Sequence, residues 1–203
     1  MRMMKVKRYR RQTGAARGVG WLLLAAAFVS SCGGSLYKVK PVVEAPVATA
    51  TGSAEAGGIR VRAVPLVTDE ESQELFEANL LLAGLLPVRV EINNESAAAL
   101  SFKRVRFELR DSSGREWKYR KPKEAVSRIL DANEVYLYNP NSRAAFETAF
   151  RAHALETATP LAVNEMRRGL IFFQTPKKSP FEGQRGLVLT VEGLPQPLEL
   201  RLD

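Results

Sequence analysis

Pro87-Val88-Arg89-Val90-Glu91-Ile92-Asn93-Asn94 alternates apolar and polar side chains along its length. Alternation with a period of two is typical of a β-strand that buries one face and exposes the other. Val88, Val90 and Ile92 fall on the buried face, and the polar residues after Ile92 indicate a turn. This stretch therefore predicts a half-buried antiparallel strand, which needs further strands beside it.

Several other segments repeat this pattern on both sides of residues 87–94. They are residues 59–64, 100–109, 115–120, 186–191 and 197–202. Residues 169–173 are apolar throughout, which predicts a central strand with both faces covered. Asp111-Ser112-Ser113-Gly114 has the composition of a hairpin loop. Short strands separated by turn signals predict a mainly β fold, either a sandwich or a barrel.

Helical periodicity replaces the β pattern at about residues 122–158, where we expect a helical insertion. Phe146, Phe150 and His153 lie on one stripe of a helix predicted at residues 143–155. Such a stripe must meet an apolar surface. We expect it to close one open end of the sandwich, and the alternative is that these three side chains contact a partner protein.

A second, shorter helix is predicted earlier in the chain. Thr68 and Glu71 match a capping box, in which a threonine caps the helix and a glutamate three residues later bonds back to it. Acidic residues in the first turn also suit the helix dipole. The alternative interpretation of this acidic turn is a cation site.

The N-terminal residues have the composition of an export signal. A basic segment at residues 1–18 precedes an apolar run at residues 21–29, which is too short to span a membrane. Val29-Ser30-Ser31-Cys32 ends this run and resembles the lipobox of bacterial lipoproteins. The resemblance implies that residues 1–31 are a signal peptide and that Cys32 is the lipid-modified N-terminus of the mature chain.

The same resemblance implies a destination. Gly33, not aspartate, follows Cys32, which in lipoproteins of two-membrane bacteria implies the periplasmic face of the outer membrane. Two alternatives remain open for this segment: an uncleaved membrane anchor, or ordinary cleavage that leaves Cys32 as a free thiol. Residues 32–57 are rich in Gly, Ala, Pro, Thr and Ser, which predicts a flexible tether before a β domain at residues 58–203.

The charge distribution gives no indication of a nucleic-acid partner. The chain has 30 Lys and Arg against 22 Asp and Glu, but seven of the cations precede Cys32. The mature chain thus has 23 cations against 22 anions, so its net charge is close to zero. A nucleic-acid-binding domain needs a basic patch on its folded surface.

Few residues are available for catalysis or for a cofactor. Histidine occurs once, at His153, and cysteine once, at Cys32, while no glycine-rich phosphate loop is present. Residues 131–134 offer oxygen ligands but lack the glycine and distal glutamate of a calcium loop. We therefore expect no catalytic residue, no cofactor and no metal. A hydrolase that uses two carboxylates needs no motif and stays open as an alternative.

The order of segments 87–94, 107–111 and 168–173 is similar to that of immunoglobulin-like domains in envelope lipoproteins. This resemblance implies an antiparallel β-sandwich and assigns no functional residue. We therefore predict a lipid-anchored cell-envelope protein that acts as a binding, assembly or structural module. Its partners would be the membrane, through Cys32, and another envelope protein. The alternatives are the carboxylate hydrolase acting on envelope polymers and a receptor for a small apolar ligand held between the sheets.

Overall fold

The computed structural model describes residues 38–42, 51–135 and 139–202. These residues belong to one compact unit, which begins at Ser35. The predicted signal peptide and Cys32 lie outside the described residues. None of the helices within those three ranges has the length and apolar character that crossing a membrane requires.

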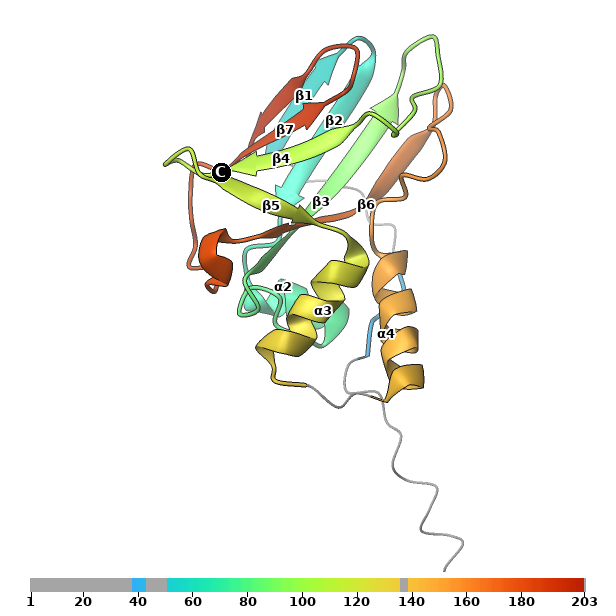
Figure 1. Ribbon diagram of the computed structural model, residues 1–203. Coiled ribbons are helices and arrows are strands. Elements are labelled where there is room, and N and C mark those ends of the chain that lie inside the picture. Colours follow the sequence, from blue (N-terminus) through green and yellow to red (C-terminus); the bar gives the residue numbers. More distant parts are fainter. Residues whose placement is uncertain (1–37, 43–50, 136–138, 203) are drawn as a thin grey trace, which may run out of the picture. The chain divides into compact units, whose positions relative to one another are not determined.

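Eight antiparallel strands form one sheet with the order β1-β2-β3-β6-β5-β4-β7-β8 (Figure 1). They are β1 (Gly52–Ala56), β2 (Ile59–Pro65), β3 (Leu85–Asn94), β4 (Arg106–Arg110), β5 (Glu116–Arg120), β6 (Met166–Gln174), β7 (Val188–Glu192) and β8 (Leu198–Arg201). A methyl group added to Gly52 of β1 would lie 2.8 Å from the carbonyl oxygen of Arg201 on β8. The two ends of the sheet therefore meet, and the sheet resembles a nearly closed barrel.

This arrangement confirms the mainly β prediction. The strand predicted at residues 87–94 is the longest in the described chain, and it pairs with β2 on one edge and with β6 on the other. The strands follow one another in a single order, so the immunoglobulin-like sandwich implied by the resemblance is not confirmed.

Three α-helices occur within the described ranges. They are α2 (Asp69–Phe76), α3 (Pro122–Ala132) and α4 (Pro140–Ala152), and they gather below the strands in Figure 1. The predicted capping box is present, because Thr68 accepts a hydrogen bond from the Glu71 amide and the Glu71 carboxylate accepts one from the Thr68 amide. The helical insertion predicted at about residues 122–158 is confirmed by α3 and α4.

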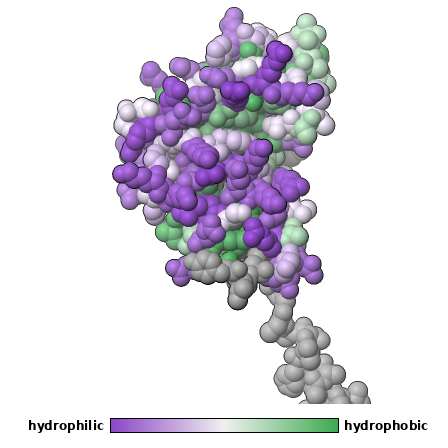
Figure 2. Space-filling model, viewed as in Figure 1, coloured by the Kyte–Doolittle hydropathy of each residue, from purple (hydrophilic) through white to green (hydrophobic). Residues whose placement is uncertain are grey.

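A first core fills the inside of the sheet. Val88, Val90 and Ile92 of β3 are fully buried there, as the alternation predicts, together with Trp117 of β5. The face seen in Figure 2 is largely hydrophilic, with apolar residues visible only in separate patches.

A second core lies between the helices and the outer face of the sheet. Leu170 and Phe172 of β6 point outward into it, while Ile171 and Phe173 of the same strand point into the first core. Both faces of β6 are therefore covered, which confirms the prediction that this segment is a central strand. The rings of Phe150 and Phe172 stack with their centroids 4.8 Å apart.

The position predicted for α4 was wrong in one respect. We expected its apolar stripe to close an open end of the β fold, yet it packs on the outer face of β6. The physical reason is that Leu170 and Phe172 give this strand a second apolar face, which packs with Phe146 and Phe150 in one buried cluster. The prediction that the apolar stripe of α4 is buried was correct, but the predicted place of burial was wrong.

The predicted boundary between tether and domain also needs correction. β1 lies inside residues 32–57, the predicted tether, so the β fold begins before residue 58. The small residues of β1 have the composition of a tether, so composition does not predict a strand here. The strand forms because β2 pairs with it across the tight turn at Gly57 and Gly58. Both glycines have positive φ, at 60° and 75°, which favours glycine over residues with a Cβ atom.

Candidate functional site: a groove beside the helices

An open groove of about 890 Å³ lies where the helices stop covering the sheet. Its floor is formed by outward-facing residues of β3 and β6. Its walls are formed by α2, by the C-terminal end of α4, by residues 40–42 and by the first residues of β6. The volume lies within the range of small-ligand sites.

The wall at the end of α4 is held to β6 by backbone hydrogen bonds. The amide of Leu170 donates to the carbonyl of His153 at 2.8 Å, and the amide of Leu155 donates to the carbonyl of Leu170 at 2.9 Å. Gly169 permits this close approach, because a methyl group there would lie 2.4 Å from the Leu155 backbone. The floor and this wall are therefore fixed relative to each other.

Arg89 lies on the floor of the groove, in the middle of β3. Its cross-strand neighbours are Val64 on β2 and Leu170 on β6, and neither side chain can accept a hydrogen bond. Arg89 is half-buried. No hydrogen bond or ion pair joins its side chain to any other residue in the described part of the chain.

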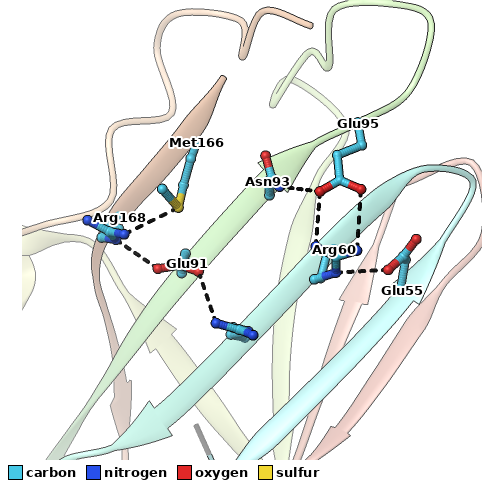
Figure 3. Close-up of polar contacts among 8 residues, drawn as sticks. Glu55, Arg60, Glu91, Asn93, Glu95, Met166 and Arg168 are labelled. Carbon is cyan, nitrogen blue, oxygen red and sulfur yellow. Dashed lines mark hydrogen bonds and ion pairs between the residues drawn. The ribbon is translucent and has the colours of Figure 1, made fainter. Parts of the chain in front are cut away.

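The carboxylate nearest in sequence on the same face is already occupied. Glu91 accepts a hydrogen bond from the Arg168 Nε atom at 2.8 Å (Figure 3). It also lies 3.8 Å from the Arg62 Nη1 atom. These three residues stand opposite one another on β2, β3 and β6. Two arginines thus neutralise Glu91, which leaves Arg89 without a counter-ion in the described part of the chain.

The remaining charged residues that line the groove have partners in their own chain. Lys40 pairs with Glu74 at 3.3 Å, and Glu165 pairs with Arg167 at 2.8 Å. Hydrogen bonds from Arg167 and from the Ala162 amide lower the pKa of Glu165. Glu71 serves the α2 cap, Glu156 accepts a hydrogen bond from the Ala158 amide, and Arg168 bonds Glu91. Arg89 differs from all of them.

Residues 38–42 form the wall nearest to the N-terminus. The Lys40 amide donates to the Leu75 carbonyl at 2.9 Å, and His153 Nε2 donates to the Lys40 carbonyl at 2.7 Å. Val39 packs against the second core. Lys40 therefore joins α2 to the end of α4, and the segment that precedes the β fold is attached to the groove.

The structure places the predicted site residues as follows. Phe146 and Phe150 are 2% and 0% exposed and belong to the second core. His153 is 7% exposed and contacts the chain's own Lys40. Cys32 lies outside the described residues. Sequence reasoning missed Arg89, although this residue stands inside the strand that defines the fold.

Comparisons with protein-family models, with curated proteins and with solved structures found no match for this chain. Within the described ranges, no group of three or more His, Cys, Asp and Glu side chains is arranged to hold a metal ion. The function must therefore be argued from the geometry of the groove.

Proposed function

We propose that this protein is a lipid-anchored binding module of the cell envelope, held through a lipidated Cys32. Its binding site is the groove between the helices and the outer face of the sheet. The single observation that carries this proposal is Arg89 on the floor of that groove, a half-buried cation with no counter-ion among the residues that the structure describes. The lipobox resemblance supports the anchor, and its Gly33 supports the periplasmic face of the outer membrane.

The attachment of Lys40 supports a groove close to the membrane. Lys40 is the eighth residue after Cys32. An extended chain spans at most ~3.6 Å per residue, so this segment reaches no further than roughly 29 Å. A lipid on Cys32 would hold the α2 side of the domain within that distance of the bilayer. A ligand in the groove would then lie near the membrane surface.

The hydrolase alternative has less support in this groove. Such an enzyme needs one carboxyl group that acts as a general acid, which requires a raised pKa. The pKa of Glu165 is instead lowered, and the other carboxylates of the groove accept hydrogen bonds from their own chain. The apolar-ligand receptor has less support too, because the inside of the sheet is packed with buried apolar side chains.

Acyl labelling combined with site-specific crosslinking tests the proposal in native envelopes. We expect an alkyne-bearing fatty acid to label the wild-type chain and to leave Cys32→Ala unlabelled. A photoreactive residue at Val42, on the groove wall, should crosslink to an envelope component. The same residue at Arg106 of β4 is the matched control. An absence of acyl label contradicts the anchor, and equal crosslinking from both positions contradicts the binding role of the groove.

A further inference from the structure

We infer that the groove binds a ligand with a single carboxylate on an apolar body, and that Arg89 holds this carboxylate. The inference rests on the proposed binding function and names the chemical class of the ligand. Three features of the described residues carry it: the unmatched charge on the floor, the carboxylates on the walls, and the apolar side chains between them.

The unmatched charge of Arg89 is suited to an anionic partner. A guanidinium group presents parallel donors that fit the two oxygens of a carboxylate, and such paired bonds are stronger than neutral hydrogen bonds. Arg89 has lost part of its hydration because it is half-buried between Val64 and Leu170. Glu91 cannot serve, because Arg62 and Arg168 already bind it. A ligand carboxylate is the partner that completes this site.

The walls limit how much negative charge the ligand can carry. The groove is lined by four cationic residues and four carboxylates, so its formal charges balance before a ligand binds. They are Lys40, Arg89, Arg167 and Arg168 against Glu71, Glu74, Glu156 and Glu165. A ligand with several negative charges would place some of them beside these carboxylates. Like charges at such short range repel each other and weaken binding. One negative charge, placed at Arg89, fits the groove.

Apolar side chains fix the rest of the ligand. Leu66, Leu75 and Leu170 line the groove between the charged groups. Val42 and Met166 are 48% and 46% exposed on its walls, although large apolar side chains are usually covered. A ligand body that covers them gains from the removal of apolar surface from water. An aliphatic acid and the C-terminus of an apolar peptide share this chemistry.

A different role for Arg89 gives a different result. Arginine can cover apolar neighbours with its methylene stem and leave its charged end in water. In that case lysine would replace it without loss, and no ligand would distinguish an acid from an amide. The two roles are therefore separated by ligand chemistry and by the Arg89→Lys variant.

The test uses the lipidated full-length protein in phosphatidylcholine nanodiscs. The probes are hexanoate and acetyl-Leu-Leu with a free carboxyl end, each carrying a neutral fluorophore, and their amides serve as controls. Fluorescence anisotropy gives the affinities, and empty nanodiscs give the background. We expect an acid that occupies the groove to bind at least about tenfold more tightly than its amide, because hydrogen bonds to a charged group are stronger than neutral ones. The arm with the larger preference identifies the source of the carboxylate.

Variants assign the preference to Arg89. Arg89→Gln should remove the difference between acid and amide, and Arg89→Lys should reduce it, because lysine lacks the planar fork. Arg106→Gln, which changes a strand arginine of β4 that also has no partner in the described residues, should keep it. Equal binding of acid and amide by the wild type would overturn the inference, as would an unchanged preference in Arg89→Gln or Arg89→Lys.

The failure of this inference differs from the failure of the proposed function. If crosslinking from Val42 is specific but acids show no preference, the groove binds a ligand of another class. If acids bind through Arg89 but Cys32 carries no acyl group, the ligand class stands and the anchor is wrong. Arg89→Lys keeps the charge on the sheet and remains informative if Arg89→Gln does not fold.

Discussion

Replacing Phe150 by alanine tests how α4 is held on the sheet. The side chain is 0% exposed, and its ring centroid lies 4.8 Å from that of Phe172 and 4.6 Å from that of Phe76. Removal of a buried phenylalanine costs about 3–5 kcal/mol, since apolar burial is lost and a cavity remains. We expect a value in the upper half of this range. Phe76 of α2 and Phe172 of β6 would line the cavity from two different elements, which cannot easily move together to fill it.

Urea unfolding of the folded unit Ser35–Asp203 measures this cost. Trp117 is the only tryptophan in that range and is 1% exposed, so its fluorescence reports unfolding. For a domain of this size each kcal/mol lowers the Tm by about 2–4 °C, so a cost of about 4–5 kcal/mol predicts a fall of roughly 8–20 °C. Thr148→Ala, on the exposed side of α4, should stay within about 0.5 kcal/mol of wild type. Unfolding curves that superimpose for Phe150→Ala and wild type would refute the packing of α4 and would make its stripe available to a partner.

Two further substitutions test the hairpin and the groove wall. Asp111 accepts hydrogen bonds from Ser113, Arg115 and Trp117; burial alone would raise its pKa, but these bonds prevail and lower it. Because the pKa of Asp111 is lower in the folded chain, its ionised form stabilises the fold at pH values above the unfolded pKa of about 3.9, and this stabilisation is lost as the pH falls below about 3.9. Asp111→Asn should therefore cost about 1.5–3 kcal/mol of stability at pH 7. It should also flatten the acid limb of a curve of stability against pH. An unchanged acid limb would show that another group controls it. Gly169→Ala should lower the Tm by several degrees, because its methyl group meets the Leu155 backbone at 2.4 Å, and a Tm equal to wild type would show that residues 153–155 are not fixed to β6.

The local patterns in the sequence were sufficient for most elements. Alternation along residues 87–94 identified β3, and the Thr68 capping box identified the start of α2, because both signals depend on residues close in sequence. The apolar run at residues 169–173 identified a strand covered on both faces. That α4 covers the outer face of this strand could not be predicted, because no pattern within α4 indicates which surface the helix will contact.

Long-range hydrogen bonds were the second source of error. Asn94 was interpreted as part of a turn, yet it is fully buried and its amide donates to the carbonyls of Leu161 and Ala162. These partners are 67 and 68 residues away in the sequence. β1 was missed for a similar reason, because its small residues form a strand only where β2 supplies the ladder. Composition describes a segment alone, whereas a sheet is defined by its neighbours.

The position of the groove was nevertheless encoded in β3. Its outward-facing residues change from apolar at Leu85 and Pro87 to charged at Arg89 and Glu91, while the inward face stays apolar from Leu86 to Ile92. A helical layer can cover Leu85 and Pro87 but not Arg89, because it is costly to cover a charge that has no partner among the described residues. The helices must therefore end at Arg89, and a groove forms where their edge meets the sheet. The same change that stops the helices leaves a half-buried cation on the floor, which is why the edge of the second core and the candidate site coincide.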